Sequence, residues 1–221
     1  MADKKTKKLG DALVIVAHPD DEVLWTGGYI MRHHEYEWKI IAVCFGAYQP
    51  RNRAFVKSCH LLNVYKYEHL DFNSNFKEEE LKSRLACLSF NDLALVITHN
   101  EINGEYDDDD DHKKVGRIVN EMAKRADVKK LLNFSYKNFQ YPAVKIDASD
   151  PTRFDDGSQE FSAVHKEEKE EVDLLLFLTH DELARKLYIL REIYLEQRVD
   201  FRNLSWPCPN PEAFKVIKSV A

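Results

Sequence analysis

Short apolar runs alternate along the chain with longer segments in which apolar residues recur every three or four positions. The first pattern is typical of strands buried in a parallel sheet, and the second of helices that pack one face against it. The alternation predicts an α/β fold with a Rossmann-like, mostly parallel sheet flanked by helices. The expected strands are 12–17, 39–45, 67–70, 93–98 and 130–134, and the expected helices are 22–33, 52–62, 77–90, 112–125 and 181–197.

Two segments between these elements are rich in polar and turn-forming residues. Residues 100–111 end in five consecutive aspartates and are predicted to form a loop, with Asp111 as the N-cap of helix 112–125. The segment 147–159, rich in Asp, Pro, Ser and Gly, is interpreted as a second loop rather than a domain boundary. With 221 residues, 44% of them hydrophobic, the chain can build one substantial core, so we expect a single domain over residues 1–221.

Charge and composition argue against several classes of function. A net charge of -6 provides no basic surface for a phosphate backbone, so no nucleic-acid partner is expected. The longest apolar runs, 12–17 and 174–178, are far shorter than the roughly 20 residues of a membrane helix, so no membrane span is expected. The four cysteines are widely spread without a Cys-x-x-Cys pair, which predicts reduced thiols and a cytoplasmic location.

The residues directly after the first predicted strand carry the strongest candidate chemistry. Ligands of parallel α/β sheets bind beyond the carboxyl ends of the strands, and His18-Pro-Asp-Asp-Glu22 occupies that position. A catalytic zinc typically takes three imidazole or carboxylate ligands and leaves one position for water. His18 and Asp21 supply two such ligands, and His112, beyond the loop after strand 93–98, is the best candidate for the third. Two histidines and a carboxylate also suit Fe(II), so the ligands alone do not fix the metal.

Longer stretches around these residues resemble a known family. Ala17-His-Pro-Asp-Asp-Glu-Val-Leu24, followed by Gly27-Gly28, is similar to the first signature of the PIG-L/LmbE-like N-acetylglucosaminyl deacetylase family. Gly104-Glu-Tyr106 and Asp111-His-Lys-Lys-Val-Gly116 match the two ends of its second signature, which resembles Gly-Glu-Tyr-Gly-His-Pro-Asp-His-x-x-Val-Gly. Thr98-His-Asn100, which precedes this second signature, also fits the pattern.

The resemblance implies an LmbE-like fold and a metal-dependent hydrolase that removes an N-acetyl group from an amino sugar or its conjugate. It implies metal ligation by His18, Asp21 and His112, with Zn²⁺, or Fe²⁺ or another divalent ion, and Asp20 as general base. The assignment is chemically consistent, because the metal would activate water and polarise the amide carbonyl while Asp20 moves the proton to the departing amine. The implied partner is a small-molecule amino sugar or glycoconjugate.

The chain departs from the family pattern at Asp109. With His112 as the anchor, Asp109 stands where the family has a histidine that helps to stabilise the oxyanion, a contribution typically of about 3 to 4 kcal/mol. One hypothesis is that neighbouring carboxylates raise the pKa of Asp109 and keep it protonated, and another is that the run 107–111 holds a second hard cation such as Ca²⁺ or Mg²⁺. A third gives the role to another histidine: His99, His165 or His180.

Arg51 and Trp25 are the candidate substrate-binding residues. Arg51 begins a predicted helix and, if it faces the crevice, can bind sugar hydroxyls or an anionic group; otherwise it is a surface residue. Trp25 replaces a residue that is small in the family, so it narrows the pocket, stacks on a sugar or belongs to the core.

The resemblance leaves an alternative function of a different class, a catalytically weak or inactive relative that binds a metal or glycan. The change at Asp109 favours this alternative, whereas the retention of Asp20 opposes it, because a binding protein needs no general base. A nucleotide-binding Rossmann domain is disfavoured, since Gly27-Gly28 does not form a Gly-x-Gly-x-x-Gly loop directly after a strand.

Overall fold

The computed structural model describes residues 9–101, 110–135, 173–194 and 212–220, and the backbone of two short strands at 145–146 and 154–155. The strands of its main sheet are β1 (Gly10–Val16), β2 (Tyr36–Cys44), β3 (Lys66–Phe72), β4 (Leu95–Thr98), β5 (Lys130–Phe134), β8 (Leu174–Leu176) and β9 (Glu212–Ser219). A separate antiparallel pair comprises β6 (Lys145–Ile146) and β7 (Phe154–Asp155). The helices are α1 (Asp21–Arg32), α2 (Gln49–Leu61), α3 (Glu78–Leu85), α4 (Asp110–Arg125), α5 (His180–Tyr188) and the π-helix η1 (Ile189–Ile193).

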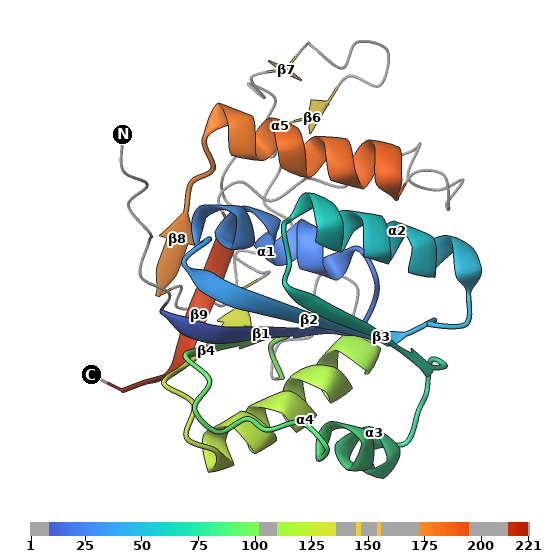
Figure 1. Ribbon diagram of the computed structural model, residues 1–221, viewed down its shortest axis with the longest axis vertical. Coiled ribbons are helices and arrows are strands. Elements are labelled where there is room, and N and C mark those ends of the chain that lie inside the picture. Colours follow the sequence, from blue (N-terminus) through green and yellow to red (C-terminus); the bar gives the residue numbers. More distant parts are fainter. Residues whose placement is uncertain are drawn as a thin grey trace, which may run out of the picture.

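The main sheet has seven strands in the order β3-β2-β1-β4-β5-β9-β8. The first five are parallel, and β9 is antiparallel to both β5 and β8. Helices α1, α2 and α5 lie on one side of this sheet and α3 and α4 on the other (Figure 1). These features confirm the predicted α/β fold with a mostly parallel sheet. That residues 1–221 form one domain stays a prediction.

Strand β1 occupies the position on which the site depends. It pairs with β2 on one side and β4 on the other, so the direction in which the chain adds strands reverses beside it. Its side chains alternate between two apolar layers, with Val14 and Val16 packed toward α1 and Leu13 and Ile15 toward α4. Because both faces are covered, the strand holds the residues that follow it in a fixed place.

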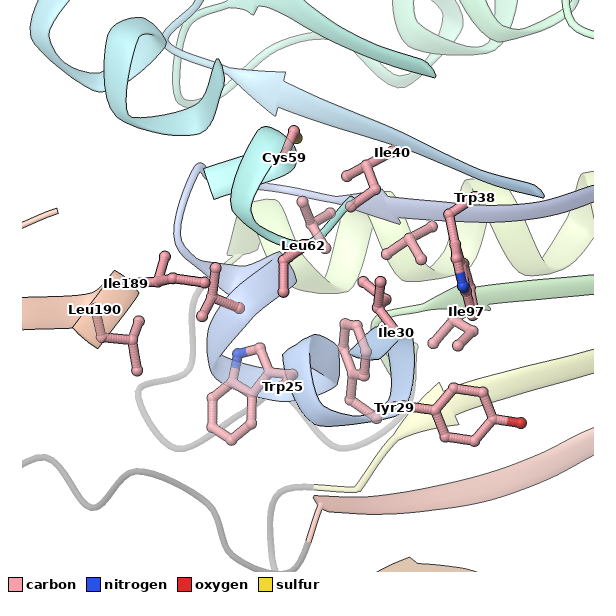
Figure 2. Packing of buried hydrophobic residues seen from close by; sticks show 14 of the residues in the cluster. Trp25, Tyr29, Ile30, Trp38, Ile40, Cys59, Leu62, Ile97, Ile189 and Leu190 are labelled. Atoms are coloured by element: carbon pink, nitrogen blue, oxygen red, sulfur yellow. The ribbon is translucent and has the colours of Figure 1, made fainter. Parts of the chain in front are cut away.

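The apolar layer beneath α1 is built from several distant parts of the chain (Figure 2). Trp25 and Tyr29 of α1 pack there with Leu62, which follows α2, and with Ile189 of η1. Trp25 is only 9% exposed, which places it among the core residues. The described part of the chain contains no helix of the length and apolar composition that a membrane crossing requires.

Several element boundaries differ from the sequence prediction. Helix α4 begins at Asp110, so Asp111 is a residue of its first turn and not the predicted N-cap. Helix α3 ends at Leu85, before the predicted end at residue 90. The predicted helix 181–197 changes into the π-helix η1 after Tyr188, and residues 195–197 lie outside the described part of the chain. Shifts of one or two residues are ordinary at helix ends, but the π-helix is a local rearrangement of the hydrogen bonds.

Strands β6 to β9 were not predicted, and β7 lies within the segment 147–159 that was interpreted as a loop. Strand β9 carries a buried charge that sequence patterns assign to the surface. Glu212 and Lys186 are both 0% exposed, and Lys186 Nζ donates to Glu212 Oε1 at 2.6 Å. The same carboxylate accepts the backbone N–H groups of Gly28 at 2.7 Å and Tyr29 at 2.8 Å. One buried ion pair thus connects β9 and α5 to the middle of α1.

We expect Lys186→Met to destabilise the protein by about 3 to 5 kcal/mol, because it leaves the Glu212 carboxylate buried without its cation. Urea unfolding monitored by circular dichroism measures this change. The matched control is Lys82→Met, which removes a partly exposed lysine from surface pairs with Glu79 and Glu121 and should leave stability nearly unchanged. Equal stabilities of the two variants would contradict the assigned role of the buried pair.

Candidate metal and catalytic site

The structure brings the predicted metal ligands together at the carboxyl end of β1. His18 and Asp21 follow this strand, and His112 lies in the first turn of α4. His18 Nδ1 lies 2.9 Å from His112 Nε2, and Asp21 Oδ2 lies 3.2 Å from His112 Nε2 and 3.8 Å from His18 Nδ1. Ligands bound at about 2.0 to 2.1 Å to a tetrahedral zinc are about 3.3 Å apart, so this nitrogen and oxygen triangle fits a divalent ion.

Surrounding groups fix the orientation of each ligand. The backbone N–H of His18 donates to Asp21 Oδ2 at 2.8 Å, and Asp111 Oδ2 lies 3.5 Å from His18 Nε2. His99 stacks on the His112 ring with the centroids 4.3 Å apart and the planes 9° from parallel. Such outer partners hold the tautomer and direction of metal-binding imidazoles.

The protonation states also suit metal binding. Burial opposes ionisation of Asp21, but the charge and hydrogen bond of His112, with the charges of His99 and His18, hold the pKa of Asp21 well below its usual range. Burial lowers the pKa of His112 to about 4, although Asp21 acts in the opposite direction. At neutral pH the cluster therefore combines an ionised carboxylate with a neutral imidazole, which are the forms that bind metal ions.

Asp20 lies beside this cluster in a different environment. Its pKa is raised to about 7 by burial and by the negative charge of Asp21, against the opposing effects of Arg51 and His18. Arg51 Nη2 lies 3.5 Å from Asp20 Oδ2, and the Arg51 guanidinium lies over the Phe45 ring, 5.0 Å from its centroid. A carboxylate with a pKa near neutrality is suited to accept and return a proton. Arg51, predicted to contact substrate, is thus placed beside the candidate base.

The structure describes two of the three histidines proposed to take the role of the family histidine that Asp109 replaces. His99 is 0% exposed, and its Nε2 accepts the backbone N–H of Ala17 at 2.9 Å. It therefore lies beneath the ligand cluster, where it contacts and supports the ligands. His180 is an exposed residue at the start of α5. His165 and Asp109 lie outside the described residues, so the hypotheses about Asp109 stay predictions. The signal for His99 in the sequence was its place directly after β4.

The acidic run enters the described structure only at Asp110 and Asp111. Asp111, His18 and Cys44 offer ligand atoms within 4.8 Å of one another. This mixture of oxygen, nitrogen and sulfur is softer than the all-oxygen sets that Ca²⁺ and Mg²⁺ prefer. The contacts of Asp111 therefore give no support to a hard-cation site, and the part played by residues 107–109 stays untested.

Comparison with known proteins decides the family. Residues 13–123, which include both signature regions, match the PIG-L family, described as GlcNAc-PI de-N-acetylase. The chain belongs to the PIG-L family. An uncharacterised protein of Acanthamoeba polyphaga mimivirus is 27% identical over 135 residues, in a match that covers 52% of this chain and 58% of that protein. The match thus spans little more than half the length of this relative.

Solved structures of other proteins share the fold of this PIG-L protein at low sequence identity. N,N'-diacetylchitobiose deacetylase from Pyrococcus horikoshii has 14% identity and a TM-score of 0.67, over 94% of this chain and 83% of that chain. The 4-carboxy-2-hydroxymuconate hydratase from Pseudomonas putida has 15% identity and a TM-score of 0.60, over 96% and 98%. The LmbE-like fold is confirmed, and because it also carries a hydratase, the reaction must be argued from the site.

The position of His112 should depend on the close approach of α4 to the residues after β4. A Cβ added at Gly116 would lie 2.6 Å from the backbone oxygen of His99, so Gly116→Ala must displace α4. We expect this variant to bind Zn²⁺ about tenfold or more weakly, the usual size of an outer-shell defect. Titration against a competing zinc chelator measures the affinity.

The matched control for this experiment is Gly27→Ala in α1. A Cβ there would meet Val23 Cγ1 at 3.4 Å, an ordinary van der Waals contact. Zinc affinity should therefore match that of the unmodified protein. An unchanged affinity in Gly116→Ala, or an equal loss in both variants, would contradict the proposed dependence on α4.

Proposed function

We propose that this protein hydrolyses the N-acetyl group of an amino sugar or of its conjugate, releasing acetate and a free amine. The single observation that carries the proposal is the pairing of a three-ligand cluster, His18, Asp21 and His112, with a separate buried carboxylate, Asp20. A metal-binding role explains the cluster alone, whereas hydrolysis also needs the base. The proposal agrees with the description of the chain's family, which is GlcNAc-PI de-N-acetylase.

In the proposed reaction the metal ligands, Asp20 and Arg51 have separate roles. A divalent ion, proposed to be Zn²⁺ with Fe²⁺ as the alternative, would supply Lewis acidity that polarises the amide carbonyl and makes water more acidic. Asp20 would accept the proton of the attacking water and then deliver a proton to the departing nitrogen. Asp21 remains ionised in the ligand cluster, so the two adjacent aspartates have different roles. Arg51 would hold the Asp20 carboxylate in place and contact the substrate.

The proposed substrate class is supported by the names of the family and of a structurally similar enzyme. The enzyme from Pyrococcus horikoshii is named for diacetylchitobiose, and the family description names a GlcNAc conjugate. Both contain an N-acetylated amino sugar, and we propose a small molecule of this class as the partner. The cytoplasmic location stays a prediction.

Metal-loaded protein should release free amine from members of a panel of N-acetylated sugars and sugar conjugates. Activity should disappear when the metal is stripped and return when Zn²⁺ is added. Asp20→Asn should lower kcat by about 10² to 10⁴, the usual contribution of a general base, while the zinc stoichiometry stays at that of the unmodified protein. The matched control, Asp11→Asn, changes an exposed aspartate of β1 and should retain full activity.

Two outcomes would count against deacetylation. An unchanged kcat in Asp20→Asn would exclude Asp20 as the general base. Stoichiometric zinc binding without cleavage of any panel member would favour the alternative, a PIG-L relative that binds metal or glycan. The observation that favours this alternative is Asp109 in place of the family histidine.

Arg51→Met should raise the KM of a cleaved substrate by about 10- to 100-fold, as expected for the loss of a hydrogen bond from a charged donor. Initial rates over a range of substrate concentrations separate KM from kcat. Arg53→Met, an exposed arginine two residues further along α2 that makes no contact with Asp20, is the control and should leave KM unchanged. An unchanged KM in Arg51→Met would exclude the substrate contact.

A further inference from the structure

Glu22, the last residue of the His18–Glu22 segment, has contacts that its place at the start of a helix does not predict. At the start of α1 its charge suits the positive end of the helix dipole, yet Glu22 is 0% exposed. Its Oε1 accepts hydrogen bonds from the hydroxyls of Ser58 in α2 and Tyr194 after η1. Its Oε2 accepts the backbone N–H of Asp20 at 2.9 Å. Both carboxyl oxygens are therefore committed inside the protein.

The backbone that Glu22 contacts has an unusual conformation. Asp20 has φ 110° and ψ -33°, in a region that residues other than glycine rarely adopt. A conformation of this kind is strained and persists only when its surroundings enforce it. The Asp20 carbonyl accepts from the N–H groups of Val23 at 3.0 Å and Leu24 at 2.8 Å, and Glu22 holds the N–H on the other side. Hydrogen bonds therefore hold both the backbone N–H and the backbone carbonyl of Asp20, the candidate base.

The two hydroxyls reach Glu22 from parts of the chain that contribute no metal ligand. Ser58 is 0% and Tyr194 is 2% exposed, so both are buried with the carboxyl group. Tyr194 directly follows the π-helix η1, and its N–H donates to Ile189 O at 3.2 Å. A π-helix changes the face on which the following residue lies, and such insertions are frequent at functional sites. Here the change accompanies the contact of Tyr194 with Glu22.

A purely structural role does not account well for this arrangement. Burying a carboxyl group costs several kcal/mol, and apolar residues of similar volume often join packed elements at least as well. The apolar layer that joins α1 to η1 is already present beside Glu22. What an apolar side chain would not supply is an acceptor for the Asp20 N–H.

We propose that Glu22 is a positioning residue for the general base: held by Ser58 and Tyr194, its carboxyl group fixes the strained backbone of Asp20 and so places the Asp20 carboxylate beside the metal ligands. This inference rests on the role of Asp20 in the proposed function. It assigns a part in catalysis to Tyr194, which lies outside the residues 13–123 matched by the family.

Variants of Glu22 and Tyr194 test the proposal by kinetics. Glu22→Leu removes the acceptor and should lower kcat about 100-fold, with KM and zinc affinity changed less than about twofold. Glu22→Gln retains an oxygen that can accept the Asp20 N–H and should recover most of this activity. Tyr194→Phe removes one hydrogen bond to the carboxyl group and should lower kcat about tenfold, the effect of roughly 1.4 kcal/mol.

The matched control is Tyr29→Phe, which removes a hydroxyl from another tyrosine of the same apolar layer and should retain full kcat. Amide hydrogen exchange of the Asp20 N–H provides a readout that does not need activity. Exchange should be faster in Glu22→Leu and Tyr194→Phe than in the unmodified protein, and unchanged in Tyr29→Phe. If no substrate is cleaved at all, the proposed function fails while this exchange experiment still tests the contact.

The positioning role would be overturned by an unchanged kcat in Tyr194→Phe, by a loss of kcat in Glu22→Leu that Glu22→Gln shares in full, or by Asp20 exchange that is the same in all variants. If Glu22→Leu fails to fold, Glu22→Gln and Tyr194→Phe still decide the question. A loss of kcat matched by an equal loss of zinc affinity would also contradict the proposal, because it would show a general disturbance of the site.

Discussion

The site depends on one buried carboxylate, Asp21, at the junction of β1 and α1. It accepts the His18 N–H at 2.8 Å and lies 3.2 Å from His112 and 3.6 Å from His99. Burial alone would favour the neutral acid, but the surrounding imidazoles and the hydrogen bond keep its pKa low. A single ionised group therefore gathers histidines from the ends of β1 and β4 and from α4. A divalent cation would complete this charge arrangement.

Asp20 and Asp21 are adjacent in the sequence, but their carboxyl groups have opposite pKa shifts because the backbone directs them toward different neighbours. Asp21 begins α1 and faces the histidines, whereas Asp20, with its positive φ, contacts Arg51. The negative charge of Asp21 adds to burial in raising the pKa of Asp20 to about 7. In the proposed function, the ligand thus helps to create the base beside it. Glu22 would maintain this difference between the two aspartates by accepting the backbone N–H of Asp20 and so fixing its position.

Much of this arrangement could be predicted from the sequence, because it depends on local patterns. The apolar run of β1 predicts a buried strand, and the position of His18 and Asp21 after it predicts a site at the strand's carboxyl end. His112 followed from the same logic and from the family signature. Trp25 remained ambiguous, since a tryptophan in the first turns of a helix fits both a pocket and a core, and the structure buries it.

The remaining features depend on contacts between distant residues. Glu22 meets Tyr194 across 172 positions, and Glu212 meets Lys186 from an antiparallel strand that no local pattern predicted. Charged residues are normally assigned to the surface, so a buried carboxyl with distant partners gives no signal in one sequence. The π-helix is equally hidden, because its apolar spacing resembles that of an α-helix.

Anomalous X-ray diffraction from crystals of the zinc-loaded protein would show directly which side chains hold the metal ion. We expect a zinc peak bonded to His18, Asp21 and His112, with the Asp20 carboxylate beside it and not bound to the ion. A peak at other residues, or the absence of zinc from these three ligands in a folded and metal-saturated protein, would contradict this expectation.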